Sequence, residues 1–269
     1  MTRYSSGSMI YNFEFVLLII FTLISVYLWK KRDDKSSFLV FIIAGSLESC
    51  IELIAQGFGV RIITETYLFN VFYVGYPFLP FILGFYEGGV FCLLSYQFVK
   101  YMLLKNKFSG ILFGASTATI TFFTFIGAMM MRLSINAGDT AINLTRRNVF
   151  NPGTTLILIV CYCITFGYLF INKNVLKKDW SGLFYWYLGI VILYGLVFVS
   201  LNIFMIRYIE IIEGSIYVTA SFYEQLLVLY GYGLALEPTG FFLPLYIIIH
   251  RFKLLPFNDK SEEFYEKIT

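Results

Sequence analysis

The chain has few ionisable side chains, and one kind is almost missing. Charged residues occupy 14% of its 269 positions, and His250 is the only histidine. A single histidine at the edge of an apolar segment cannot build a histidine-rich zinc site, and no serine motif accompanies it to form a catalytic pair. The last apolar run contains no lysine that could hold retinal, and no aspartate-rich run for magnesium-diphosphate chemistry is present. Several classes of membrane enzyme and photoreceptor are thereby excluded.

Cysteines and basic patches are equally scarce. All four cysteines lie inside apolar segments, so no disulfide framework is expected. The lysines and arginines form short clusters between apolar runs, and the net charge is only +3. This distribution predicts no nucleic-acid partner.

Apolar residues, by contrast, are abundant. They make up 58% of the chain, and the mean hydropathy is +0.74, more apolar surface than one soluble core of this size can bury. Seven runs are each long enough to cross a bilayer core of about 30 Å. These runs cover residues 10–29, 37–59, 68–100, 109–131, 154–173, 181–206 and 226–249. We therefore predict an all-α, multi-pass membrane protein with one seven-helix domain over 1–256 and a short tail, 257–269.

The basic residues predict the orientation. Of the 20 lysines and arginines, 14 fall on one side when the connections are assigned alternately, and six fall on the other. Because cytoplasmic loops carry the excess of basic residues, the N-terminus is expected outside or in the lumen and the C-terminus in the cytoplasm. The host membrane would be the endoplasmic reticulum or the plasma membrane.

The second run carries polar side chains where apolar ones are expected. Glu48, Glu52 and Gln56 recur every four residues, so on a helix they share one face. Glu48 lies 13 residues after Lys35, Glu87 lies 13 before Lys100, and Glu237 lies 13 before His250. That separation is about 20 Å along a helix, so three helices offer a carboxylate at one depth. Glu52 and Gln56 are expected about one turn further out.

No basic residue lies at that depth to neutralise these carboxylates. Desolvation and mutual repulsion both favour the neutral acid, which is the form that general acid catalysis requires. We identify Glu48, Glu87 and Glu237 as candidate catalytic residues. The alternative is that each glutamate is protonated and only hydrogen-bonds a neighbouring helix.

Polar and aromatic residues around this level are candidates for binding a substrate. Aromatic faces stabilise a nearby cation by about 0.5–2 kcal/mol, although apolar packing explains most aromatic residues in such a chain. The candidate substrate-binding residues are Glu52, Gln56, Tyr86, Tyr232, Phe241 and Trp186.

Two short segments resemble a known family. Gly45-Ser46-Leu47-Glu48 is similar to the helix-two motif of the small seven-helix membrane-bound terpene cyclases of the paxilline and meroterpenoid pathways, with leucine in place of the tryptophan. Leu236-Glu237-Pro238 is similar to the acidic site of their helix seven, with glutamate in place of aspartate. That family is metal-independent and protonates an epoxide or olefin on a prenylated substrate. The resemblance implies that Glu48 is the acid or its partner and that Glu237 is the second catalytic carboxylate.

Three functions therefore remain open. The first is acid-catalysed cyclisation or isomerisation of a lipid-soluble isoprenoid, without metal or other cofactor. The second is a seven-helix carrier or receptor that binds a cation or a small amphiphile in the same acidic pocket. The third is a non-catalytic subunit of a membrane complex. The expected partners are membrane lipid and a lipophilic small molecule, and the sequence indicates no particular protein partner.

Overall fold

The computed structural model describes most of the chain. The described residues are 2–4, 7–59, 61–62, 65–136, 144–147, 152–171, 180–204, 206–212, 216–227, 230, 242–252 and 254. The predicted site residues Glu237, Tyr232 and Phe241 lie outside this set, as does the tail 257–269.

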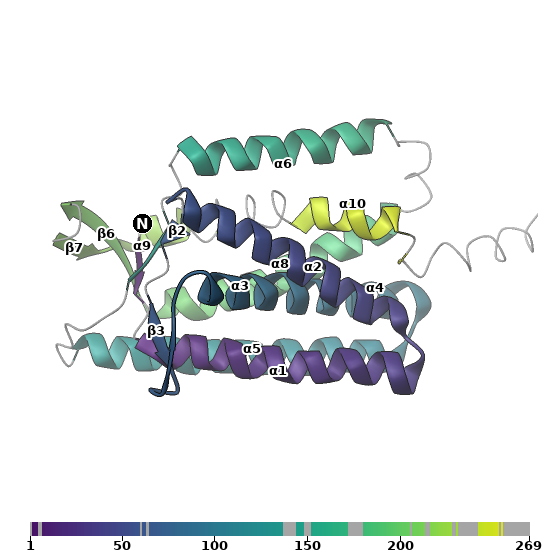
Figure 1. The fold of residues 1–269 in the computed structure, drawn as a ribbon, viewed down its shortest axis with the longest axis horizontal. Helices are drawn as coiled ribbons and strands as arrows, with labels where there is room; N and C mark the ends of the chain where they lie inside the picture. The colour runs from purple at the N-terminus through teal and green to yellow at the C-terminus, as the bar shows by residue number, and fades with distance from the viewer. Residues whose placement is uncertain are drawn as a thin grey trace, which may run out of the picture.

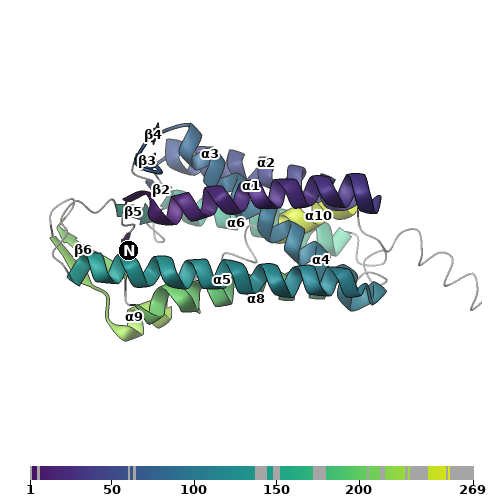
Figure 2. The ribbon, with the colours of Figure 1, turned by 90° about the horizontal axis from the view of Figure 1, so that it is seen from below.

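Long helices run along one axis of the molecule (Figure 1). Short polar connections interrupt the apolar runs, so successive helices reverse direction. Both views place the small strands at one end of the bundle and the α1–α2 turn at the other (Figures 1 and 2). The helices are α1 (Gly7–Arg32), α2 (Lys35–Gly57), α3 (Phe78–Phe85), α4 (Phe91–Leu104), α5 (Lys107–Asn136), α6 (Pro152–Ile171), α8 (Trp180–Ile203), α9 (Phe222–Leu227) and α10 (Leu243–Arg251). A single π-helical turn, η1 (Tyr86–Val90), joins α3 to α4.

Among the residues that the structure describes, five helices are long and apolar enough to cross a membrane. They are Ile10–Arg32, Lys35–Gly57, Phe78–Leu104, Lys107–Leu133 and Ser181–Ile203. Large apolar side chains on their outer surfaces are exposed, as a lipid-facing surface requires. These features are those of a helical membrane-embedded protein. The two other predicted spans correspond to α6 and to a run of which α10 is the last part, so the count of seven stays a prediction.

The third apolar run begins with a hairpin rather than with a helix. The strands β3 (Thr66–Leu68) and β4 (Phe72–Val74) pair in antiparallel fashion, and Phe69 and Asn70 turn the chain with positive φ angles of 55° and 58°. Two successive residues with positive φ form the kind of tight turn that suits a hairpin. The predicted span 68–100 is therefore too long at its start, because the aromatic residues of the hairpin raise its apolarity without making it helical.

A small sheet accompanies the helices, although the described chain is mostly helical, as predicted. Five strands pair in the order β2-β5-β1-β6-β7 at the N-terminal end of the bundle. They are β1 (Thr2–Tyr4), β2 (Arg61–Ile62), β5 (Leu144–Arg147), β6 (Arg207–Ile212) and β7 (Ile216–Thr219). Strands this short, drawn from connections far apart in sequence, leave no signal in a search for runs of 20 residues.

The rod formed by α3, η1 and α4 is the centre of the bundle. In its span, 72% of the most apolar window is buried, against 28–44% in the other four candidate spans. A helix that is apolar on every side is expected in the interior, and α4 packs against α2, α5 and α8. Polar groups on the central rod are therefore shielded from both water and lipid.

Candidate functional site

Glycines bring α2 into close contact with the central rod. A Cβ atom added at Gly84 would lie 2.7 Å from the Cα of Ser49, and one added at Gly88 would lie 2.4 Å from the Cβ of Glu48. No residue larger than glycine fits at these points. Gly84 and Gly88 are four residues apart, which is the spacing of the small-residue motif that packs membrane helices closely. This glycine spacing is visible in the sequence and is the signal from which the contact could have been predicted.

A hydrogen bond between helices adds to this contact. The hydroxyl of Ser49 on α2 lies 2.8 Å from the carbonyl oxygen of Phe81 on α3 and 2.8 Å from that of Gly45 in its own helix. Such bonds between helices contribute on average about 0.6 kcal/mol in membranes. Together with the glycines, it fixes the position of α2 along the rod.

Three carboxylates converge at this contact. One carboxylate oxygen from each of Glu48, Glu52 and Glu87 lies within 4.8 Å of the other two. Glu48 and Glu52 are 4% and 5% exposed, and Glu87, within the π-helical turn, is half-buried. The predicted convergence of Glu48 and Glu87 is therefore present. Glu52, which was expected one turn further out, belongs to the same cluster.

The cluster is strongly acidic for its surroundings. Residues 36–58 and 78–99 contain no lysine, arginine or histidine. Two unit charges at this separation repel by about 3–4 kcal/mol when the effective dielectric constant is about 20. Three ionised carboxylates at this spacing would each repel the other two, so the cluster is suited to hold protons or a cation that reduces its negative charge.

Three side chains are within electrostatic range of the cluster, one of them Cys161 on α6, which interacts with the charge of Glu48. Tyr86, which precedes Glu87 on the π-helical turn, is 4% exposed and interacts with the charges of Glu14 and Glu87. Cys92 on α4 is fully buried and is within range of Glu48. Tyr86 is thus the one predicted aromatic residue that the described part of the chain places beside the carboxylates.

The remaining predicted residues have different surroundings. Gln56 is half-buried on α2, in the helical turn that follows Glu52. Trp186 is fully buried on α8, where its Nε1 donates to the carbonyl oxygen of Phe242 over 3.3 Å and its ring packs against Tyr246. These are packing contacts with the segment around α10, so a role of Trp186 in substrate binding stays a prediction.

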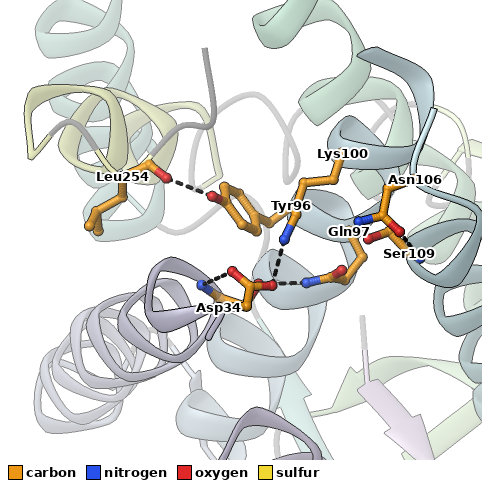
Figure 3. A network of polar contacts seen from close by, with 8 residues as sticks. Asp34, Tyr96, Gln97, Lys100, Asn106, Ser109 and Leu254 are labelled. Carbon is orange, nitrogen blue, oxygen red and sulfur yellow. Dashed lines mark hydrogen bonds and ion pairs between the residues drawn. The ribbon is translucent and has the colours of Figure 1, made fainter. Parts of the chain in front are cut away.

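A second group of polar side chains, which was not predicted from the sequence, lies at the opposite end of α2 (Figure 3). The Nζ of Lys100 lies 2.5 Å from the Oδ2 of Asp34, and both side chains are 12% exposed. The hydroxyl of Ser37 donates to the same carboxylate over 2.6 Å, and the Nε2 of Gln97 donates to that hydroxyl over 2.6 Å. We call Asp34, Ser37, Gln97 and Lys100 the basal network. It joins the α1–α2 turn to α4.

Asp34 has a further role in starting α2. Its Oδ1 accepts a hydrogen bond of 3.3 Å from the backbone N–H of Ser37, which is the usual capping interaction at a helix N-terminus. In the sequence, an aspartate directly before a helical run was the signal from which this cap could have been predicted. Its pairing with Lys100, 66 positions later, depends on the fold.

The exposed hairpin holds a glutamate in a different setting. The hydroxyl of Tyr73 on β4 donates a hydrogen bond to Glu65, and this bond to a carboxylate raises the pKa of Tyr73. Glu65 is exposed and lies outside the five candidate spans. It is therefore a suitable reference for substitutions in the buried cluster.

Comparison of the chain with family models, with curated proteins and with solved structures finds no match. The function must accordingly be argued from the carboxylates themselves.

Proposed function

We propose that the protein is an integral membrane enzyme in which Glu48, Glu52 and Glu87 act as a shared proton donor and acceptor. Its reaction would be the cyclisation or isomerisation of a lipid-soluble isoprenoid. The observation that carries this proposal is the meeting of three carboxylates from two helices within 4.8 Å in an apolar bundle. A buried group of this kind can keep one carboxyl protonated beside another that is ionised, which supplies an acid and a base together.

The proton would move through the reaction as follows. A protonated carboxyl donates its proton to an olefin carbon or an epoxide oxygen of the substrate, which leaves a carbocation and a carboxylate. Ring closure or migration of the double bond follows, and a neighbouring carboxylate removes a proton from a carbon next to the cation. The face of Tyr86 would stabilise the cation by about 0.5–2 kcal/mol. The site ends with the same number of protons that it began with.

The resemblance to membrane-bound terpene cyclases supports the choice of substrate class. It rests on the segments around Glu48 and Glu237, and we propose Glu237 as a further carboxylate of the site. We also propose seven membrane crossings, with the N-terminus outside or in the lumen of the endoplasmic reticulum or outside the plasma membrane. Labelling of single cysteines introduced into each connection would test this topology.

The donor set favours a second candidate function. Carboxylate oxygens are the ligands that Ca²⁺ and Mn²⁺ prefer, and oxygens around one Ca²⁺ lie about 2.3–2.6 Å from the ion. A spacing of at most 4.8 Å between the three oxygens fits such an ion between them. The protein would then be a carrier or receptor for a cation, which is the second of the three functions that the sequence left open.

Three amide substitutions separate these functions. Glu48→Gln, Glu52→Gln and Glu87→Gln each remove one proton site and one charged ligand while keeping the size of the side chain. For the enzyme, each variant should convert an epoxidised isoprenoid at least about a hundredfold more slowly, as expected for the loss of an acid or base. The infrared band of protonated carboxyl groups should also decrease in at least one variant.

Glu65→Gln is the matched control, because it makes the same change on the exposed hairpin. It should leave both turnover and the infrared band as they are in the unmodified protein. Calorimetric titration with CaCl₂ and MnCl₂ tests the second candidate. Binding that is lost in the three cluster variants and kept in Glu65→Gln, without turnover of any isoprenoid, would replace the enzyme by the carrier or receptor.

A further inference from the structure

The end of the bundle that holds the basal network carries exposed basic side chains on two turns. Four of the candidate spans begin or end on these turns, α1–α2 and α4–α5, so the turns lie at the level of lipid headgroups. The exposed basic residues there are Lys30, Lys31, Arg32, Lys35, Lys105 and Lys107. We call them the basal basic face.

The face has little negative charge of its own. Residues 28–36 and 98–110 contain two acidic residues, Asp33 and Asp34. Asp34 already pairs with the partly buried Lys100 at 2.5 Å. In the part of the chain that the structure describes, Lys100 is the one basic residue at this end with a carboxylate partner. The six exposed basic residues therefore leave this end strongly positive.

Arg32 links the two turns. The carbon of its guanidinium lies over the ring of Phe108 on α5, 4.2 Å from the ring centroid. Stacking of this kind uses the flat face of the guanidinium, whereas the N–H donors lie in its plane and stay available at the edge. An arginine held in this way can bind a phosphate with two parallel hydrogen bonds. The fold thus fixes the Arg32 guanidinium beside the α4–α5 turn.

Lys105 has a backbone conformation that favours glycine. It ends α4 in the left-handed region, with φ of 54° and ψ of 30°. Glycine is the usual residue at such a position, because it has no Cβ atom to clash with the backbone. Lysine is more strained there than glycine would be. Strain of this kind is often retained where the side chain has a function.

Position and charge together indicate the partner. Clusters of about four to eight basic residues at the end of membrane helices attract anionic lipid headgroups. We propose that the basal basic face binds the headgroup of an anionic phospholipid, with the phosphate held by the Arg32 guanidinium and the Lys105 ammonium. This site lies at the opposite end of α2 from the glutamate cluster and does not depend on its proposed chemistry.

Native mass spectrometry of the full-length protein in neutral detergent tests the proposal. Dioleoylphosphatidylglycerol is the anionic probe, and dioleoylphosphatidylcholine, in which choline balances the phosphate charge, is the neutral one. The unmodified protein should bind phosphatidylglycerol at least about fivefold more tightly than phosphatidylcholine. Arg32→Gln and Lys105→Gly should each lower the affinity for phosphatidylglycerol about fivefold, the scale of one basic residue at an anionic lipid surface.

Arg132→Gln is the matched control. It removes the same charge as Arg32→Gln, but from a position roughly 37 Å along α5 from Lys107. Its affinity for phosphatidylglycerol should stay within about twofold of that of the unmodified protein, well below the fivefold scale of a basic residue at the site. Lys105→Gly should fold even if Arg32→Gln does not, because glycine suits the left-handed conformation.

Arg32→Lys separates a phosphate site from a general attraction between charges. It keeps the positive charge but loses the planar pair of donors, so the affinity for phosphatidylglycerol should fall by about threefold or more. Full affinity in Arg32→Lys would overturn the assignment of the phosphate to the guanidinium.

Three other results would overturn the proposal as a whole. They are equal affinity for the two lipids, an equal loss of affinity in Arg132→Gln and Arg32→Gln, and binding of glycerol 3-phosphate without preference for phosphatidylglycerol. The last result would replace the lipid by a soluble phosphate compound.

Discussion

The glutamate cluster and the basal network lie on the same two elements, α2 and the central rod, but they balance charge in opposite ways. In the basal network, Asp34 has Lys100 at 2.5 Å, and each donor has an acceptor in the neighbouring helix or turn. In the glutamate cluster, three carboxylates face one another within 4.8 Å, and their segments contain no basic residue. The basal network thus neutralises its own charge, because a lysine and an aspartate pair within it. In the glutamate cluster, a bound proton or cation would reduce the repulsion among the three carboxylates.

The largest loss of stability is expected from a substitution at the contact between α2 and the central rod. Gly88→Ala adds a Cβ atom that would lie 2.5 Å from the carbonyl oxygen of Ala44 and 2.4 Å from the Cβ of Glu48. The helices must separate, which should lower the free energy of unfolding by about 3 kcal/mol, the upper part of the range for overpacking. Turnover should be lost as well, because the carboxylates move apart.

Gly114→Ala is the control for this prediction. A Cβ atom at Gly114 on α5 meets nothing within 4 Å, so the protein should stay as stable or gain up to about 1 kcal/mol from the better helix propensity of alanine. Unfolding in mixed micelles measures both variants. Equal stability of the two would show that the contact between α2 and the rod is looser than described.

Breaking the basal network should give the next largest effect. Lys100→Met keeps the length of the side chain but leaves the partly buried Asp34 without its cation, at a cost of about 1–3 kcal/mol. Lys107→Met, at an exposed position at the start of α5, should change stability little. In the double variant with Asp34→Asn, most of the loss should be recovered. If the loss of stability in the double variant equals the sum of the losses in Lys100→Met and Asp34→Asn, the two side chains do not interact.

In the glutamate cluster, removing a charged group is expected to change the free energy of unfolding in the opposite direction. Glu52→Gln removes one of three repelling carboxylates, so the free energy of unfolding should stay constant or rise by about 0.5–2 kcal/mol while activity falls. Unfolding in the same micelles, together with turnover or cation binding, measures both quantities. If Glu52→Gln destabilises the protein as Lys100→Met does, the cluster is a structural network, and the contrast between the two regions disappears.

The smallest effect concerns the hydrogen bond that positions the cluster. Ser49→Ala removes the bond from α2 to the Phe81 carbonyl and should cost about 0.6 kcal/mol. Ser200→Ala removes a hydroxyl that, among the described residues, bonds within α8, to the Leu196 carbonyl at 2.8 Å, and so tests whether the effect depends on the contact between helices. A decrease in turnover in Ser49→Ala beyond this small loss of stability would show that the position of α2 matters for the site.

The sequence predicted those features that depend on length and depth along a helix. Counting residues from the basic flanks placed Glu48 level with Glu87, because a helix rises by a constant amount per residue. The inclusion of Glu52 was not predicted, because the close approach at Gly84 and Gly88 and the π-helical turn bring a second turn of α2 to Glu87. Regular helical geometry cannot anticipate that local change, although the glycine spacing could have indicated the contact.

Other features depend on chain segments that meet only in the folded protein. Asp34 is 66 positions from Lys100, and no pattern in either segment names the other. The strands are two to six residues long, too short for the apolar alternation that predicts a half-buried strand. Phe72 and Tyr73 added to an apolar run and so hid the hairpin within a predicted helix.

The position of β1 determines when the sheet can form during synthesis of the chain. β1 is the central strand and lies between β5 and β6, whose residues follow it by about 140 and 200 positions. Its second neighbour, β6, follows α8 in the chain, so β1 cannot be paired on both edges until α8 has been synthesised. β1 therefore gains its full set of backbone hydrogen bonds late, after the helices between β1 and β6 have been synthesised.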